Sequence, residues 1–209
     1  MHDDLRRDYD AVAGEYARRI SGELEGKPLD RALLEVFAEQ VRAHGPVADL
    51  GCGPGHVGAW LAARGLEVTG VDLSPALLEE GRRRFPAVRF TEGDLLSLPL
   101  ADASQGGAVA FYSLIHLAPE EWPRALAEVR RVLRPGGRLL VAFHVGAETL
   151  LLDAWWGVPV SVDFRLLDPA WVQGQLEAAK FIVEVTTRRV PYPEVEHPSE
   201  RAYLLARRG

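Results

Sequence analysis

The sequence contains very little cysteine. Cys52 is the only cysteine among 209 residues. A single thiol can form no disulfide within the chain, and it rules out a metal site built from several thiolates. We therefore expect no metal centre, and the sequence favours the reducing environment of the cytoplasm.

Long apolar runs and an excess of positive charge are also missing. No apolar run approaches the roughly 18 to 20 residues of a membrane span, and the N-terminal MHDDLRR lacks the apolar segment of a signal peptide. The formal net charge is -6. The chain therefore has no broad cationic surface for nucleic acid or for an anionic membrane, and a small molecule is the better candidate for a partner.

Short β-type runs alternate with amphipathic stretches along most of the chain. This alternation predicts a parallel sheet covered by helices on both faces. A proline-rich bend joins the last two runs, which predicts a hairpin at the sheet edge. The runs lie at 47–50, 67–71, 88–91, 108–113, 139–143, 181–186 and 202–206.

Capping residues and prolines mark the expected helices. Ser74 and Pro75 predict the start of one helix, and Asp168 with the proline after it predicts another that ends near residue 179. A helix from Pro119 should end at the Pro-Gly-Gly of 135–137. Two further helical stretches precede the first strand, and we expect them to cover the mouth of the sheet.

The most informative segment is DLGCGPG at 49–55, in which a strand leads into a glycine-rich turn and then a helix. Glycines let a ligand lie against bare backbone, and the helix N-terminus offers unpaired N–H groups. The segment is not the phosphate-binding Gly-x-Gly-x-x-Gly, because His56 occupies the last position, and it is not a Walker loop. The alternative is a turn that needs its glycines for its own geometry.

Acidic residues follow the next two strands. Asp72 lies 21 residues after Gly51, the spacing at which a carboxylate reaches ribose hydroxyls in dinucleotide folds. Asp94 ends the third run in the same way. Either residue alone is typical of a helix cap or a solvated loop. Three consecutive strand ends carrying such groups indicate a ligand site, because ligands bind beyond the carboxyl ends of parallel strands.

Together these segments resemble the class I S-adenosylmethionine-dependent methyltransferases that act on small molecules. The resemblance covers residues 9–144 well and the remainder in outline. The matching segments are YDAVAGEY at 9–16, DLGCGPG at 49–55, VDLS at 71–74, GDL at 93–95, SLIH at 113–116 and RPGG at 134–137.

The resemblance implies a single α/β domain over residues 1–209 with a three-layer, doubly wound, Rossmann-like fold. Its sheet would have seven mostly parallel strands with an antiparallel last strand. One departure is Lys180, where the family often has glycine. The expected parts are an N-terminal helical lid at 1–45, a cofactor-binding core at 46–144, an insert on the substrate side at 145–167, and a C-terminal helix and hairpin at 168–209.

The resemblance also assigns residues to S-adenosyl-L-methionine, whose product is S-adenosyl-L-homocysteine. Gly51 and Gly53 would lie under the methionine part of the cofactor. Asp72 would hold the ribose, and Leu73 would lie against the adenine.

The remaining cofactor residues come from three other segments. Asp94 would accept a hydrogen bond from the adenine amino group, while the Leu95 N–H would donate to the ring. Tyr16 and Tyr9 would approach the methionine carboxylate from the lid, and Ser113 would lie beside the cofactor.

Two histidines are candidates for a catalytic base or for a group that orients the substrate. His116 follows the fourth strand, whose end faces the transferred methyl group in this fold, and it is the first candidate. His144 ends the fifth strand and is the second. The alternative for His116 is packing of the lid or capping of a helix. We expect His56 to start a helix and His197 to lie in a bend.

The insert at 145–167 is rich in apolar and aromatic residues, among them Trp155 and Trp156. One interpretation is a wall for a hydrophobic or aromatic acceptor that is methylated on oxygen or nitrogen. The other is ordinary core or a dimer contact, so a monomer and a homodimer are both open.

Three other functions compete with this interpretation. A nicotinamide-dependent oxidoreductase would need glycine at position 56 and a catalytic Tyr/Lys pair or a second domain. A nucleic-acid methyltransferase would carry Asn/Asp-Pro-Pro-Tyr where this chain has YSLI at 112–115. A non-catalytic S-adenosylmethionine-binding protein that acts by interaction stays open.

Overall fold

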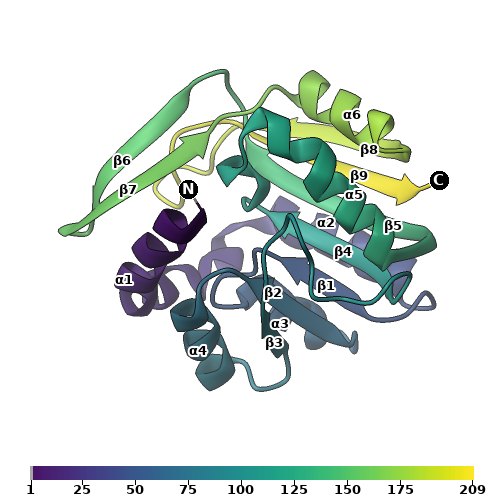
Figure 1. Ribbon diagram of the computed structural model, residues 1–209, viewed down its shortest axis with the longest axis horizontal. Helices are drawn as coiled ribbons and strands as arrows, with labels where there is room; N and C mark the ends of the chain where they lie inside the picture. Colours follow the sequence, from purple (N-terminus) through teal and green to yellow (C-terminus); the bar gives the residue numbers. More distant parts are fainter. Residues whose placement is uncertain (1) are drawn as a thin grey trace.

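Seven strands form one central sheet in the order β3-β2-β1-β4-β5-β9-β8 (Figure 1). The structure is a computed structural model that describes residues 2–209. The strands are β1 (Val47–Leu50), β2 (Val68–Asp72), β3 (Arg89–Glu92), β4 (Gln105–Phe111), β5 (Leu133–His144), β8 (Phe181–Arg189) and β9 (Arg201–Arg208).

The first five strands of the sheet run parallel, and β9 is antiparallel to both of its neighbours, β5 and β8. The expected seven-stranded, mostly parallel sheet with an antiparallel last strand is confirmed, as is the hairpin of β8 and β9. Lys180 has φ 65°, so the turn before β8 keeps the left-handed backbone that glycine would adopt there.

Helices cover both faces of the sheet. The α2 and α3 helices lie on one face, and α5 and α6 lie on the other. None of the helices in the described part of the chain is long and apolar enough to cross a membrane. The helices are α1 (His2–Ile20), η1 (Glu23–Gly26), α2 (Pro28–Val41), α3 (His56–Ala62), α4 (Pro75–Arg84), η2 (Leu114–His116), η3 (Pro119–Glu121), α5 (Trp122–Val132) and α6 (Pro169–Ala178).

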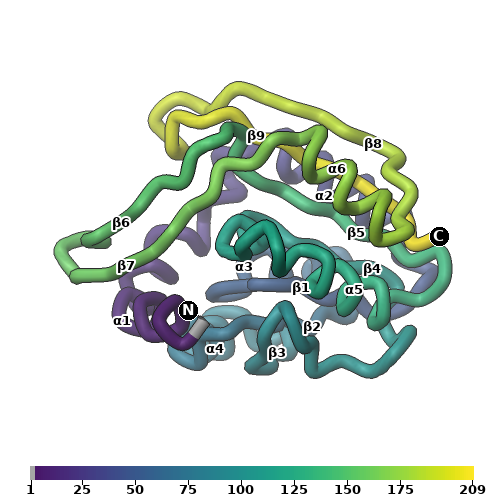
Figure 2. Tube along the Cα trace, turned by 45° about the horizontal axis from the view of Figure 1, so that its top comes forward, coloured from purple at the N-terminus to yellow at the C-terminus, as the bar shows by residue number. Residues whose placement is uncertain are grey.

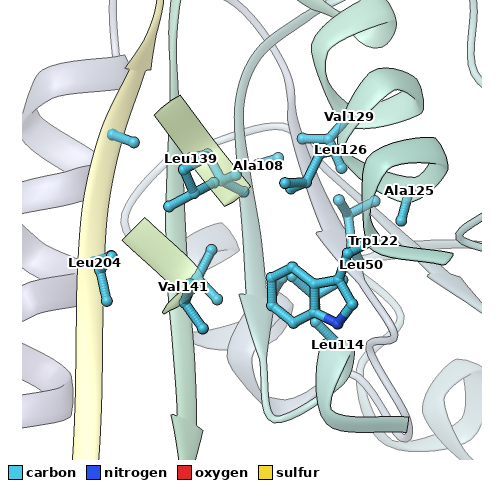
Figure 3. Packing of buried hydrophobic residues seen from close by; sticks show 14 of the residues in the cluster. Leu50, Ala108, Leu114, Trp122, Ala125, Leu126, Val129, Leu139, Val141 and Leu204 are labelled. Atoms are coloured by element: carbon cyan, nitrogen blue, oxygen red, sulfur yellow. The ribbon is translucent and has the colours of Figure 1, made fainter. Parts of the chain in front are cut away.

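Alternate side chains of the inner strands feed the two sides of the core. In β4, Ala108 and Ala110 face the α5 side while Val109 and Phe111 face the α2 side, as the two-residue period of a strand requires. Trp122, at the start of α5, is fully buried in the cluster on the α5 side, where its ring lies near Leu50 and Leu114 (Figure 3).

The two N-terminal helices have different positions. The α1 helix packs against α4 and β7, outside the sheet (Figure 2). The α2 helix instead buries Phe37 and Val41 on the sheet face, against the backbone of Gly107. Both helices were expected to cover the mouth of the sheet. Only α1 does so, because the apolar face of α2 is buried in the core.

The insert forms a β-hairpin that the sequence pattern did not predict. The strands β6 (Thr149–Trp155) and β7 (Val158–Arg165) pair antiparallel and extend from the main sheet over α1 (Figure 1). Trp156 and Gly157 form the turn with φ values of 50° and 83°. Two successive positive φ values match the hairpin turns whose twist suits paired strands.

We predict that Trp122→Ala lowers the free energy of unfolding by roughly 3 to 5 kcal/mol, because it leaves a large cavity under α5. Leu151→Ala is the matched control, since Leu151 is 78% exposed and its truncation should change stability by less than about 0.5 kcal/mol. Urea denaturation measures both, and equal effects would contradict this packing.

Candidate active site

One cavity of about 410 Å³ lies along the carboxyl edge of the sheet. Residues that follow β3, β2, β1, β4 and β5 line it, and adjacent strands lie about 4.8 Å apart. The cavity therefore has two ends, which we call the β3 end and the β5 end. It brings together all the predicted site residues: Tyr9, Tyr16, Gly51, Gly53, Asp72, Leu73, Asp94, Leu95, Ser113, His116 and His144.

The glycine-rich turn forms the middle of the cavity floor. Gly51 and Gly53 have φ values of 66° and 53°, which disfavour any side chain. A Cβ atom on Gly51 would lie 2.2 Å from the Cβ of Ser113. Gly51 therefore lets the ends of β1 and β4 approach each other beneath the cavity.

Asp72 is held between the turn and the start of α4. One carboxylate oxygen accepts from the Gly53 N–H at 2.7 Å, and the other accepts from the Ser74 N–H at 2.9 Å. Burial raises the pKa of Asp72, against the effect of these hydrogen bonds. The carboxylate is thus fixed in place beside the backbone of the turn.

Asp49 is an acidic cavity residue that sequence reasoning did not select. It is fully buried in β1, and its carboxylate accepts from the Gly58 N–H of α3 at 2.8 Å. Burial raises its pKa to about 6. The available signal was an acidic residue inside an otherwise apolar strand.

The α1 helix crosses the cavity in the order of the strands beneath it. Arg6 pairs with Glu92 at the end of β3 at 3.4 Å. Asp10 accepts from the Ser74 hydroxyl at 2.5 Å, next to the end of β2. Tyr16 lies above Gly53, after β1. The helix is therefore attached at successive strand ends and covers the ligand space between them.

Two further predicted residues, Asp94 and Ser113, line the β3 end and the floor of the cavity. Asp94 accepts from the Leu96 N–H at 2.8 Å, which shapes the loop after β3. The Ser113 hydroxyl is buried and has no hydrogen-bond partner within residues 2–209. A buried polar group of this kind needs a partner, and Ser113 lines the cavity, so a polar ligand atom is a candidate partner for it.

His116 is fixed by two hydrogen bonds. Its Nδ1 lies 3.0 Å from the Asp163 carbonyl oxygen of β7, and its Nε2 lies 2.9 Å from the Tyr9 hydroxyl. Because a carbonyl can only accept, we assign the ring proton to Nδ1, and the Nε2 lone pair accepts from Tyr9. Burial lowers the pKa of His116 to about 4, so the ring is neutral near pH 7.

His144 differs from His116 in its tautomer, because its ring proton is on Nε2 and not on Nδ1. Its Nδ1 lies 2.8 Å from the Ser199 hydroxyl, which itself accepts from Arg201 at 2.7 Å. The same hydroxyl lies 3.4 Å from His197 Nδ1, so His144 Nδ1 is its closer histidine neighbour. We therefore assign the hydroxyl proton to His144 Nδ1 and the ring proton of His144 to Nε2. Burial, followed by the charge of Arg201, lowers the pKa of His144 to about 3.

A buried ionic cluster surrounds the β5 end and was not found from the sequence. Its members are at least 92% buried at the side chain and connect α2 with β8, β9 and the loop between these strands. The sequence pattern does not reveal the cluster, because the ion pairs that join α2 to the C-terminal strands connect distant residues, as in the 159-residue separation of Arg189 and Asp30. The members are Lys27, Asp30, Arg189, Glu196 and Arg201.

Comparison with known proteins identifies the family. A family model described as a methyltransferase domain matches residues 47–137. A malonyl-[acyl-carrier protein] O-methyltransferase of Serratia marcescens is 32% identical over 190 residues, which are 88% of this chain and 73% of that protein. The chain belongs to the class I S-adenosylmethionine-dependent methyltransferases.

Further relatives of this methyltransferase agree. A demethylmenaquinone methyltransferase of Beutenbergia cavernae is 33% identical over 144 residues, which are 68% of this chain and 55% of that protein. The crystal structure of a Burkholderia thailandensis 1,6-didemethyltoxoflavin-N1-methyltransferase with bound S-adenosylhomocysteine is similar with a TM-score of 0.69 and 25% identity. That similarity covers 99% of this chain and 88% of the other.

The cavity of the methyltransferase fits S-adenosylmethionine, the cofactor of its family. The turn at Gly51 and Gly53 provides a floor without side chains, and the Ser113 hydroxyl lacks a partner. Asp49 and Asp72 add two buried carboxylates, which suit hydroxyl groups and positive charge. Family membership also decides against the nicotinamide-dependent oxidoreductase.

We predict that the pH dependence of stability will depend on His144. The folded-state pKa of about 3 lies below the ordinary value of 6.5, so the unfolded chain binds a proton that the folded chain rejects. Stability from this residue is present above pH 6.5 and is lost as the pH falls towards 3. His144→Gln should therefore lose less stability than the wild type between pH 6.5 and 4.5, by up to about 1.4 kcal/mol per pH unit. Urea denaturation at each pH measures the stability, and an equal loss in wild type and His144→Gln would contradict the lowered pKa of His144.

Proposed function

We propose that this methyltransferase transfers the methyl group of S-adenosylmethionine to an oxygen or nitrogen of a small acceptor bound towards the β5 end of the cavity. The observation that carries the proposal is that His116 Nε2 can accept a proton, since it accepts the hydrogen bond of the Tyr9 hydroxyl. His116 lines the same cavity as Asp72 and the glycine-rich turn. Relatives named for O- and N1-methylation support both acceptor atoms. Cytoplasmic location and a monomeric or homodimeric state belong to the same proposal.

The cofactor residues are proposed on their positions along the cavity. Asp94 and Leu95, at the β3 end, would bind the adenine, with Leu73 against its ring. Asp72 would accept from the ribose hydroxyls. The backbone of Gly51 and Gly53 would support the methionine part, with Tyr16 above the turn and Ser113 beside it. Bound S-adenosylmethionine supplies a methyl group that is already activated by its sulfonium.

The chain's own contribution is orientation and removal of a proton. Holding the acceptor in line can supply up to about 7 to 11 kcal/mol of the barrier. His116 Nε2 is the base in this proposal: an acceptor O–H or N–H replaces the Tyr9 hydroxyl as the donor to Nε2 and passes its proton there. Tyr9 stays protonated, because burial raises its pKa. In the absence of acceptor, the Tyr9 hydroxyl donates to His116 Nε2. We therefore propose that Tyr9 contacts the base, where the resemblance implied a contact with the methionine carboxylate.

The aromatic wall of the cavity supports an acceptor with an apolar part. Trp155 and Phe164 of the hairpin line the cavity beside Tyr9 and His116. Trp156 does not line it; the residue is 38% exposed, and its ring stacks on that of Trp155. The pocket-wall interpretation of the insert therefore applies to Trp155 and Phe164.

S-adenosylhomocysteine at about 100 times its dissociation constant should stabilise the fold by roughly 2.7 kcal/mol. Asp72→Asn should remove most of this gain, because a neutral amide accepts ribose hydroxyls more weakly. Asp102→Asn, at an exposed surface position, is the matched control and should retain it. Denaturation with and without ligand measures the gain, and an unchanged wild type would refute the cofactor assignment.

With an acceptor found by screening for S-adenosylhomocysteine release, His116→Gln should lower kcat by about 10² to 10⁴-fold. Affinity for S-adenosylhomocysteine should stay unchanged in the same variant, which separates the loss from damage to the cofactor site. Equal kcat values in wild type and His116→Gln would exclude the base. Cofactor binding without methyl transfer to any acceptor would favour the non-catalytic binding protein.

A further inference from the structure

We propose that the β5 end of the cavity is an anion subsite and that the acceptor is a small organic acid, whose carboxylate is bound by His144 and Lys27 with Arg201 behind them. The inference rests on the proposed function and names the substrate class of the same site. All three residues line the cavity, and they come from the end of β5, the start of α2 and the start of β9.

Two of these groups are cations buried at the wall of the cavity. The side chains of Lys27 and Arg201 are 5% and 2% exposed. Burying charge is expensive, and buried ion pairs often contribute little net stability. Cations retained in such a place are better explained by a ligand than by stability of the fold.

Glu196 is the acidic residue shared by the cations of this wall, but its carboxylate is hydrogen-bonded mainly to other partners than Lys27 and Arg201. Glu196 accepts from both terminal nitrogens of Arg189 and from the Tyr192 N–H at 2.8 Å. Lys27 and Arg201 lie further away, with Nζ and a guanidinium nitrogen at 3.6 Å and 3.5 Å from Glu196. The carboxylate is therefore already engaged, chiefly by Arg189.

Both Lys27 and Arg201 have N–H groups that make no hydrogen bond within the described chain. Lys27 has three N–H donors and makes one direct hydrogen bond within residues 2–209, to Glu23 at 2.6 Å. Glu23 is in turn shared with His56 at 2.9 Å. Arg201 donates from its terminal nitrogens to the Ser199 and His197 carbonyl oxygens and to the Ser199 hydroxyl, and only its buried Nε has no hydrogen-bond partner in the described chain. Buried donors require acceptors, so this wall has more donors than it uses.

His144 adds a neutral donor directed by its own tautomer. Its Nδ1 is occupied by Ser199, so Nε2 carries the proton and has no partner within the described residues. An imidazole fixed in this way cannot take a proton from the acceptor at Nε2, but it can donate a hydrogen bond to an oxygen. This distinguishes His144 from His116, whose Nε2 carries a lone pair that accepts from the Tyr9 hydroxyl.

The two regions of the cavity then have opposite preferences. Asp49 and Asp72, beside the turn, place negative charge where a cationic group binds well. Lys27, Arg201 and His144 offer donors at the β5 end, where an anionic oxygen binds well. An acceptor with an acid group at one end would enter in a single orientation, with the rest of the molecule extending towards Trp155 and His116.

Calorimetric titration of the protein saturated with S-adenosylhomocysteine tests the subsite. The probes are benzoate, phenylacetate and octanoate, each compared with its own amide, so that shape is kept while charge is removed. At least one carboxylate should bind about tenfold or more tightly than its amide, because a charge-assisted hydrogen bond is stronger than a neutral one. If no carboxylate binds more tightly than its amide, the anion subsite is overturned.

Variants assign the preference to residues. Lys27→Met and His144→Leu should each reduce the carboxylate-to-amide ratio, whereas His144→Gln, which keeps an N–H donor, should retain more of it than His144→Leu. Lys180→Met is the matched control, since Lys180 is the other lysine and does not line the cavity.

The same titrations distinguish the two proposals. A ratio unchanged in both Lys27→Met and His144→Leu would contradict the assignment of the subsite to these residues. Failure to bind S-adenosylhomocysteine in the first step would refute the proposed function instead. The His144 variants give a second route to the answer if Lys27→Met does not fold.

Discussion

The structure depends on one constraint, the parallel alignment of five neighbouring strands whose carboxyl ends meet at the same edge of the sheet. Each strand delivers its next few residues to that edge, so the loop after β1, the acids after β2 and β3, Ser113 after β4 and His144 at the end of β5 lie along one cavity. The cavity is possible because Gly51 has no side chain to separate β1 from β4. The order of the strands in the sheet therefore sets the order of these polar groups along the cavity.

The open side of this cavity is closed by segments outside the sheet. Asp10 joins α1 to the start of α4, and the β6–β7 hairpin holds His116 through the Asp163 carbonyl. The same hairpin places Trp155 against Tyr9, with ring centroids 5.5 Å apart. The candidate base is thus held by α1, through the Tyr9 hydroxyl, and by the β6–β7 hairpin. We therefore expect changes in the hairpin to alter acceptor choice while leaving the glycine-rich turn intact.

The gathering of the proposed cofactor residues at one cavity could be predicted from sequence, because the signals for them are local. A glycine-rich turn directly after a strand, and an acid 21 residues after Gly51, are read without knowing any long-range contact. The acceptor side could not be predicted in the same way. The pairing of Lys27 with Glu196 joins residues 169 positions apart, and the tautomers of His116 and His144 depend on Asp163 and Ser199 in other segments. The helix α2 was expected over the cavity because periodicity gives an apolar face but not the surface that it covers.

Hydrogen–deuterium exchange with and without S-adenosylhomocysteine tests the central claim most directly, because it locates the ligand along the strand ends. The account predicts slower exchange at the backbone amides of the 51–55 turn, at Leu73 and Leu95, and along α1, with little change in β8 on the far edge of the sheet. Unchanged exchange at the turn, or slowing confined to other parts of the chain, would contradict it.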